Sequence, residues 1–238
     1  MKREITSNVY DEDILLQGMQ FQINTYYEPK AIEDQRRIEI VLEKLKPGLN
    51  EKILDIGCGV GTFAFHSAKR GAIASGIDYS GESIKMAQKI CGTYGMYDNP
   101  KYITGSALKL PFEDSSFDKI VSIDFIEHIT HEEKEILLKE IYRVLKNGGM
   151  ALIFTPSGTR EKIGEYYWKL RHLVFKDEIP TTDLHYGLIN RPDFEKLIEK
   201  HKFSYKLHYK DTTRPYLAKL PLLRNFLALN LLWIIKKV

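Results

Sequence analysis

The chain has 238 residues, a formal net charge of +3 and 43% hydrophobic residues, which fits one large globular domain with a substantial core. Two cysteines, Cys58 and Cys91, exclude a disulfide framework and fit a reducing cytoplasm. No apolar run follows Met1–Glu4, and no segment reaches the roughly 18–20 apolar residues of a membrane span. We therefore expect neither a secretory leader nor a membrane-spanning helix.

Apolar spacing divides the first two thirds of the chain into alternating helices and strands, after an N-terminal stretch (1–30) without clean periodicity. The expected helices cover 31–46, 63–70, 80–90 (with Ser80 as N-cap) and 132–145, the last ending at the Lys146–Gly149 stop. The expected strands cover 52–56, 73–78, 101–104, 119–124 and 150–154. Five alternations of strand and helix predict a mostly parallel sheet.

The last third of the chain is less regular. Residues 157–185 are rich in aromatic side chains and form an expected insertion, either a substrate lid or a helical pair that covers a sheet edge. A helix is expected over 191–201, with Pro192 in its first turn. The segments 203–209 and 231–237 are expected to form an antiparallel pair of strands, joined by an amphipathic connection around 221–227.

A glycine-rich loop follows the first expected strand and carries the clearest functional signal. The loop reads Asp55-Ile56-Gly57-Cys58-Gly59-Val60-Gly61, and a second acid, Asp78, ends the second expected strand. Glycines let a ligand approach the backbone, and an acid on the second strand can bind both hydroxyls of a ribose. Asp55 would repel a pyrophosphate, so the pattern indicates a nucleoside ligand with a cationic group. The alternative is an ordinary tight turn.

This pattern resembles the class I S-adenosylmethionine-dependent methyltransferases. The segments 110–118 and 143–149 also resemble that class, in particular its ubiquinone/menaquinone-type or glycan-cluster small-molecule branch. The resemblance is good over 50–156 and loose in the last third. It implies S-adenosylmethionine as methyl donor, S-adenosylhomocysteine as product, and a Rossmann-like seven-stranded, mostly parallel sheet. Helices would cover both faces of this sheet, its last strand would be antiparallel, and a small lid would be inserted.

The same resemblance divides the chain into four parts. They are an N-terminal helical segment that covers the donor site (1–50), the donor-binding α/β core (51–156), the lid insertion (157–190), and a C-terminal helix and strand pair that completes the sheet (191–238).

Several segments are implied to contact the donor. Asp55 would lie near its amino-acid end, Asp78 would bind the ribose, and Tyr79 would lie against the adenine. Ser106 stands where many relatives carry an acid, so its contact with the adenine amino group would be weaker. Arg36 or Arg37 would pair with the donor's carboxylate, or both would be exposed helix surface. The candidate donor-binding residues are Asp55, Gly57, Cys58, Gly59, Gly61, Asp78, Tyr79, Ser106, Ala107, Leu108, Asp124 and Arg37.

Acceptor chemistry is expected at the end of the fourth strand, where the sequence reads Asp124-Phe125-Ile126-Glu127-His128. His128 is a candidate general base, because imidazole titrates near neutral pH, or else a structural cap of the next turn. Together with His185 these acids resemble the metal-binding set of some O-methyltransferases, but Asp124 is shorter than the glutamate of that set, and no metal site is predicted. The candidate catalytic residues are His128, Asp124 and His185.

The expected function is methyl transfer to a small-molecule acceptor, in particular a hydroxyl of a hydrophobic or anionic metabolite such as a quinone precursor or a lipid-linked sugar. Residues 196–238 carry a charge of +8, which leaves −5 for the rest of the chain. This basic, apolar region predicts peripheral contact with a membrane or a lipid-linked substrate through 214–230, or a solvated basic surface over a core. The alternatives are a nucleic-acid methyltransferase and a non-catalytic donor-binding protein. No nucleic-acid partner is expected, because no RNA-binding module is visible.

Overall fold

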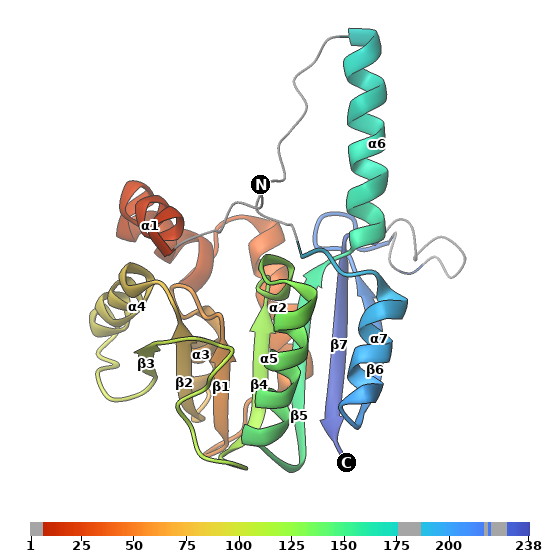
Figure 1. The fold of residues 1–238 in the computed structure, drawn as a ribbon. Helices are drawn as coiled ribbons and strands as arrows, with labels where there is room; N and C mark the ends of the chain where they lie inside the picture. The colour runs from red at the N-terminus through yellow and green to blue at the C-terminus, as the bar shows by residue number, and fades with distance from the viewer. Residues whose placement is uncertain (1–6, 176–186, 217–218, 220–227) are drawn as a thin grey trace.

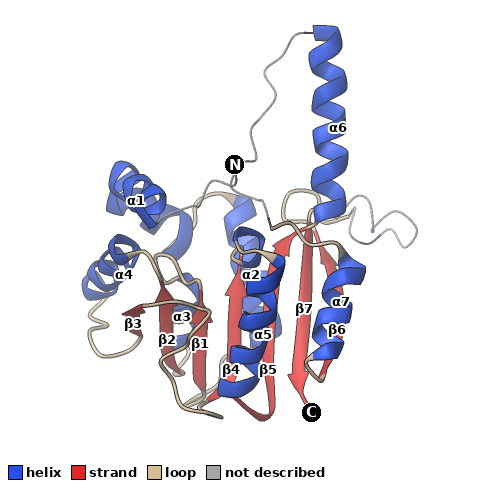
Figure 2. Ribbon diagram, in the orientation of Figure 1, coloured by secondary structure: helices blue, strands red, loops and turns tan. Residues whose placement is uncertain are grey.

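The computed structural model describes residues 7–175, 187–216, 219 and 228–238. These residues form one seven-stranded sheet with helices on both faces (Figures 1 and 2). The strands are β1 (Lys52–Ile56), β2 (Ile73–Asp78), β3 (Lys101–Thr104), β4 (Phe117–Ile123), β5 (Leu145–Pro156), β6 (Phe203–Lys210) and β7 (Asn230–Lys237). The helices are α1 (Ser7–Gln22), η1 (Ile23–Tyr27), α2 (Ile32–Leu45), α3 (Thr62–Ala68), α4 (Gly81–Thr93), η2 (Ile126–His128), α5 (His131–Val144), α6 (Gly158–Phe175) and α7 (Arg191–Lys200).

The strand order across the sheet is β3-β2-β1-β4-β5-β7-β6. Strands β1 to β5 are parallel, and β7 runs antiparallel to both β5 and β6. This order confirms the expected Rossmann-like sheet with an antiparallel last strand. The strand order reverses between β1 and β4, and in such sheets the crevice at the carboxyl ends of these strands is where ligands bind.

Strand β1 shows how the core forms on both faces of the sheet. Ile53 and Leu54 are both fully buried, although successive side chains of a strand point to opposite faces. Ile53 packs in a cluster with Val41 of α2, whereas Leu54 packs in a cluster with Leu137 of α5. A continuous apolar run therefore marks a strand that helices cover on both sides.

Strand β5 begins five residues earlier than the sequence predicts. Leu145 has an extended backbone and pairs with Phe117, so α5 ends at Val144 and not at a glycine stop. The register then shifts between Phe117 and Lys119, and Met150 continues the ladder beside Lys119. The predicted stop at 146–149 is therefore an irregularity at the start of β5. Burial of Leu145 in the core favours the extended backbone there.

The described part of the expected insertion is a single helix, α6, which starts two residues after β5 and projects away from the body of the protein (Figure 1). The rest of that segment, 176–186, lies outside the described residues, as does most of the connection around 221–227. Among the described helices, none has the length and apolar character needed to cross a membrane.

Candidate functional site

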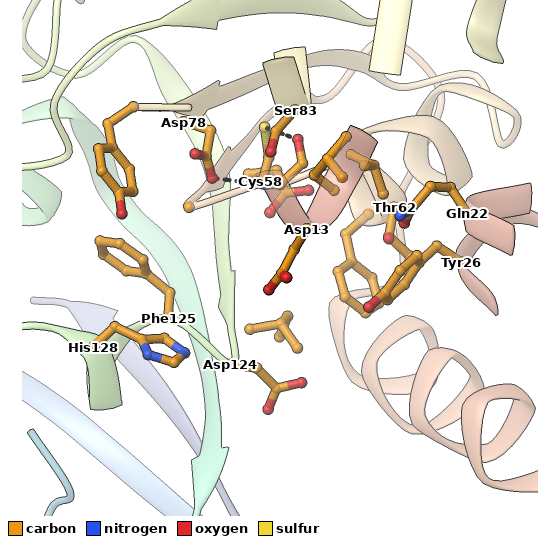
Figure 3. Close-up of a pocket in the computed structure, with 18 of the residues that line it drawn as sticks. Asp13, Gln22, Tyr26, Cys58, Thr62, Asp78, Ser83, Asp124, Phe125 and His128 are labelled. Carbon is orange, nitrogen blue, oxygen red and sulfur yellow. Dashed lines mark hydrogen bonds between the residues drawn. The ribbon is translucent and has the colours of Figure 1, made fainter. Parts of the chain in front are cut away.

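A cavity of about 300 Å³ opens at the carboxyl edge of the sheet (Figure 3). Its walls come from the loops after β1, β2 and β4, from α1 and the first helical turns that follow it, and from Arg37 of α2. The site therefore lies at the point where the strand order reverses, and its lining residues fall between positions 13 and 128.

The glycine loop after β1 forms one wall of this cavity. Gly57 and Gly59 have φ angles of 67° and 51°, a left-handed backbone that favours glycine. A Cβ added to Gly57 would lie 2.4 Å from the ring of Phe125, so this position has no room for a side chain. A Cβ on Gly59 would meet no protein atom within 4 Å. The Gly59 backbone is therefore open to a ligand.

Asp78 lies beside this loop at the end of β2. Its Oδ2 accepts from the Gly59 amide at 2.8 Å, and its Oδ1 accepts from the Ser80 amide at 2.9 Å. Each carboxylate oxygen can accept a second hydrogen bond from a ligand in the cavity. Burial raises the pKa of Asp78, and hydrogen bonds from the backbone amides of Ser80, Gly59 and Tyr79 oppose this shift. The loop and Asp78 thus hold one another in place at the cavity wall.

Asp55 is buried at the end of β1, with 2% of its surface exposed. Its Oδ2 accepts from the amide of Ala64 at 3.1 Å, in the first turns of α3. Burial raises the pKa of Asp55 to about 7, despite the hydrogen bonds from the α3 backbone. Asp55 lines the cavity and fixes the helix that follows the glycine loop.

Asp124 and Arg37 join two distant parts of the chain at the cavity wall. Arg37 Nη1 donates to Asp124 Oδ2 at 2.8 Å, and the guanidinium carbon lies 5.4 Å from the centre of the Tyr26 ring. Asp124 has a φ of 50°, an uncommon conformation for a residue other than glycine, and it directly follows β4. Residues held in such conformations are frequent at functional sites.

His128 ends the short helix η2 and lines the same cavity, on the side of Phe125 and Asp124 (Figure 3). Behind it, Glu127 is 1% exposed and its Oε2 accepts from the Thr155 hydroxyl at 2.9 Å. Lys134 donates to the carbonyl of Ile129, the residue after η2. The turn that carries His128 is therefore held by buried polar contacts on its far side.

The first helical segment contributes a wall that periodicity did not reveal. Asp13 of α1 points toward the interior of the cavity (Figure 3), and Gln17, Gln22 and Tyr26 also line it. The backbone of Gly18 is not helical, with a φ of 71°, and this kink interrupts the helical period. The sequence feature of this segment that could still indicate a packed element was the aromatic pair at 26–27.

Two polar atoms at this wall have no partner among the described residues. The fully buried Gln22 donates through Nε2 to Gln17 Oε1 at 2.9 Å, but its own Oε1 is unpaired. The Nε of Arg37 is likewise buried and unpaired. Both atoms are covered by protein, so Gln22 and Arg37 line the cavity through their other atoms.

The structure brings most, but not all, of the predicted site residues to the cavity. Gly61 faces the ring of Tyr102 instead, and the segment after β3 is also absent from the wall. His185 lies outside the described residues, within which no group of three or more His, Cys, Asp or Glu side chains is placed to hold a metal ion. The predicted residues on the wall are Asp55, Gly57, Cys58, Gly59, Asp78, Tyr79, Asp124, Arg37 and His128, and those off it are Gly61, Ser106, Ala107 and Leu108.

This combination of sheet order, glycine loop and strand-end acids defines an α/β protein with a nucleoside-type site. Residues 54–153 match the family described as Methyltransferase domain. The demethylmenaquinone methyltransferase of Chlorobaculum tepidum is 32% identical over 184 residues, which cover 75% of this chain and 69% of that protein. The chain belongs to the class I S-adenosylmethionine-dependent methyltransferases.

Two further comparisons agree with this family. The sterol 4-C-methyltransferase strm-1 of Caenorhabditis elegans is 29% identical over 188 residues, covering 75% of this chain and 56% of that protein. The chain spans about half the length of several curated relatives that it matches. The structure of a geranyl diphosphate methyltransferase in complex with SAM shares the fold, with a TM-score of 0.66, 16% identity and coverage of 86% of each chain.

Proposed function

We propose that this protein transfers the methyl group of S-adenosylmethionine to a hydroxyl of a small hydrophobic or anionic metabolite, in the range of quinone precursors and lipid-linked sugars. The observation that carries the proposal is the charge of the cavity wall. Four carboxyl groups and one guanidinium, Arg37, line it among the described residues. Burial raises the pKa of Asp55 to about 7, so this acid is partly protonated at neutral pH, but the carboxyl groups still outnumber the guanidinium. Such a wall favours a ligand with cationic groups and disfavours a pyrophosphate. The four acids are Asp13, Asp55, Asp78 and Asp124.

The polar groups of the wall match the chemical groups of the donor. Both oxygens of Asp78 retain acceptor capacity for a ribose, and the open backbone at Gly59 leaves room beside them. The acids of the wall suit an ammonium group, and the guanidinium of Arg37 suits a carboxylate. These are the groups at the amino-acid end of the donor. Gly61, Ser106, Ala107 and Leu108 stay predictions as donor contacts.

The donor, when bound, supplies a methyl group already activated by its sulfonium, so the protein mainly has to position the acceptor. His128 lies at the cavity wall next to Asp124 and Phe125. We infer that His128 takes the proton of an acceptor hydroxyl. Asp124, held by Arg37, orients polar groups nearby and stabilises positive charge. His185 stays a prediction for the acceptor side.

The acceptor is also proposed to come from a lipid-rich environment, with 214–230 in contact with the membrane or a lipid-linked substrate. The support for this is the charge of +8 over 196–238. The demethylmenaquinone and sterol enzymes among the relatives are named for lipid-like acceptors.

A transfer assay tests the function. Purified protein is incubated with methyl-labelled S-adenosylmethionine and separate pools of polar metabolites, lipids and nucleic acid, with and without a chelator. We expect label in a small-molecule or lipid pool, unaffected by chelation, and a rate about 10² to 10⁴ lower in His128→Ala because general-base catalysis is lost. Label in nucleic acid alone would contradict the proposal, and so would full activity of the variant.

A further inference from the structure

Helix α6 exposes an apolar stripe along its length. Ile163, Tyr166, Tyr167, Leu170 and Leu173 are exposed by 42% to 71%. They recur at intervals of three and four residues, and such intervals place side chains on one face of a helix. An exposed, contiguous row of large apolar side chains is uncommon on a soluble protein and marks an interaction surface.

The charged residues of α6 are ordered around this stripe. At about 100° per residue, Lys162 and Lys169 lie on one side of it, and Arg160 and Arg171 lie on the other. Glu161 falls on the opposite face of the helix. Long basic side chains at the border of an apolar face can bury their stems there and extend their charges toward anions.

This arrangement is typical of a helix that lies in the plane of a membrane surface. The apolar stripe would enter the boundary between headgroups and acyl chains, tyrosine favours that boundary, and the flanking cations would meet anionic headgroups. A helix–helix contact with another protein would not need cations on both sides of the apolar stripe. The charge pattern therefore favours an anionic lipid surface as the partner.

The position of α6 supports the same partner. The helix starts at Gly158, two residues after β5, and projects from the carboxyl edge of the sheet (Figure 1). This is the edge at which the cavity opens, beside Asp124 and His128. A bilayer bound along α6 would thus lie on the side of the molecule where an acceptor enters.

We propose that α6 is an interfacial helix that binds the protein to anionic phospholipid surfaces through the stripe of Ile163, Tyr166, Tyr167, Leu170 and Leu173. Binding rests on α6 alone and does not require methyl transfer. It differs from the contact proposed for 214–230, because α6 is a separate element whose own exposed stripe carries the binding.

Vesicle flotation of the full chain tests this proposal. Vesicles of phosphatidylcholine alone are compared with vesicles that also contain phosphatidylglycerol, at low and at high salt. We expect the protein to float with the anionic vesicles, and less so at high salt because salt screens the charges. The double variant Tyr166→Ser/Leu170→Ser should lower the bound fraction at least about tenfold, because two large apolar side chains no longer leave water.

Matched variants separate the apolar contribution to vesicle binding from the electrostatic one. Tyr97→Ser removes a side chain that is 79% exposed and lies far from α6 in sequence, and it should bind as the wild type does. Lys162→Glu should weaken binding to anionic vesicles only. Unchanged donor affinity shows that each variant is folded, since none of these residues lines the cavity. No flotation of the wild type, or equal flotation of the double variant, would overturn the proposal. A lipid-free dimer that the double variant abolishes would assign the stripe to a second copy instead and would also overturn it.

Discussion

At the scale of single residues, burial changes the acid chemistry around the cavity. Burial raises the pKa of Glu127 to about 8, and the negative charge of Asp124 adds to this shift. The ordinary pKa of a glutamate is about 4.3. Between the two pKa values, Glu127 therefore carries a proton in the folded protein but has lost it in the unfolded chain.

This difference predicts a pH-dependent stability. The raised pKa of Glu127 contributes to the free energy of unfolding. This contribution is fully present below about pH 4.3 and is lost as the pH rises toward about 8. The variant Glu127→Gln keeps an acceptor for Thr155 and removes the titration. The difference in unfolding free energy, variant minus wild type, should therefore increase with pH by at most about 1.4 kcal/mol per pH unit. Urea unfolding between about pH 5 and pH 8 measures this. Parallel pH profiles of the two proteins would contradict it.

At the scale of elements, the proposed donor site depends on how α1 docks on α4. Asp11 of α1 accepts from the Ser80 hydroxyl at 2.5 Å and from the Glu82 amide at 3.3 Å. Negative charge is favourable at this position, because the first turn of a helix presents free amides and a positive dipole end. This contact holds the part of α1 that brings Asp13 and Gln17 to the cavity.

Loss of this contact should therefore weaken donor binding without unfolding the protein. In Asp11→Ala we expect the affinity for S-adenosylhomocysteine to fall roughly five- to tenfold, because a charge-assisted hydrogen bond is lost and α1 is no longer fixed. Asp98→Ala removes an exposed acid outside the cavity and serves as control. Calorimetry measures both. Equal affinity of Asp11→Ala and wild type would show that α1 does not organise the site.

The same elements show what the sequence can and cannot predict. Asp55, Asp78 and Asp124 were identifiable because each lies at the carboxyl end of an apolar strand, and parallel strands bring these ends to one edge. The capping box of α5, in which Thr130 and Glu133 bond one another's backbone, has a local sequence pattern that predicts the observed start of this helix better than apolar spacing does. Gln22 could not be predicted, because its place at the cavity follows from the docking of a kinked helix.

At the scale of the whole molecule, the core around β7 and the proposed binding cavity lie at different places along the sheet. Trp233 of β7 is fully buried in the core under α7. The centre of its ring lies 4.9 Å from the centre of the Phe194 ring. The cavity lies at the reversal between β1 and β4, with β5 between that point and β7. The C-terminal strand pair thus completes the core without contributing to the cavity wall.

Trp233→Ala should accordingly lower the free energy of unfolding by about 3–5 kcal/mol, because it leaves a large cavity in the core. The donor affinity of the remaining folded protein should stay within about twofold of the wild type. Denaturant unfolding and calorimetry well below the melting temperature measure the two effects. A parallel loss of donor affinity would show that the sheet transmits changes in β7 to the site.

The most direct test of the central claim is a calorimetric titration of wild type and Asp78→Ala with S-adenosylhomocysteine. The account predicts binding to the wild type and an affinity more than about tenfold weaker in the variant, because charge-assisted hydrogen bonds to the ribose are lost. Circular dichroism establishes that the variant is folded. Equal affinities, or no binding to the folded wild type, would contradict the assignment of the glycine loop and Asp78 to the donor.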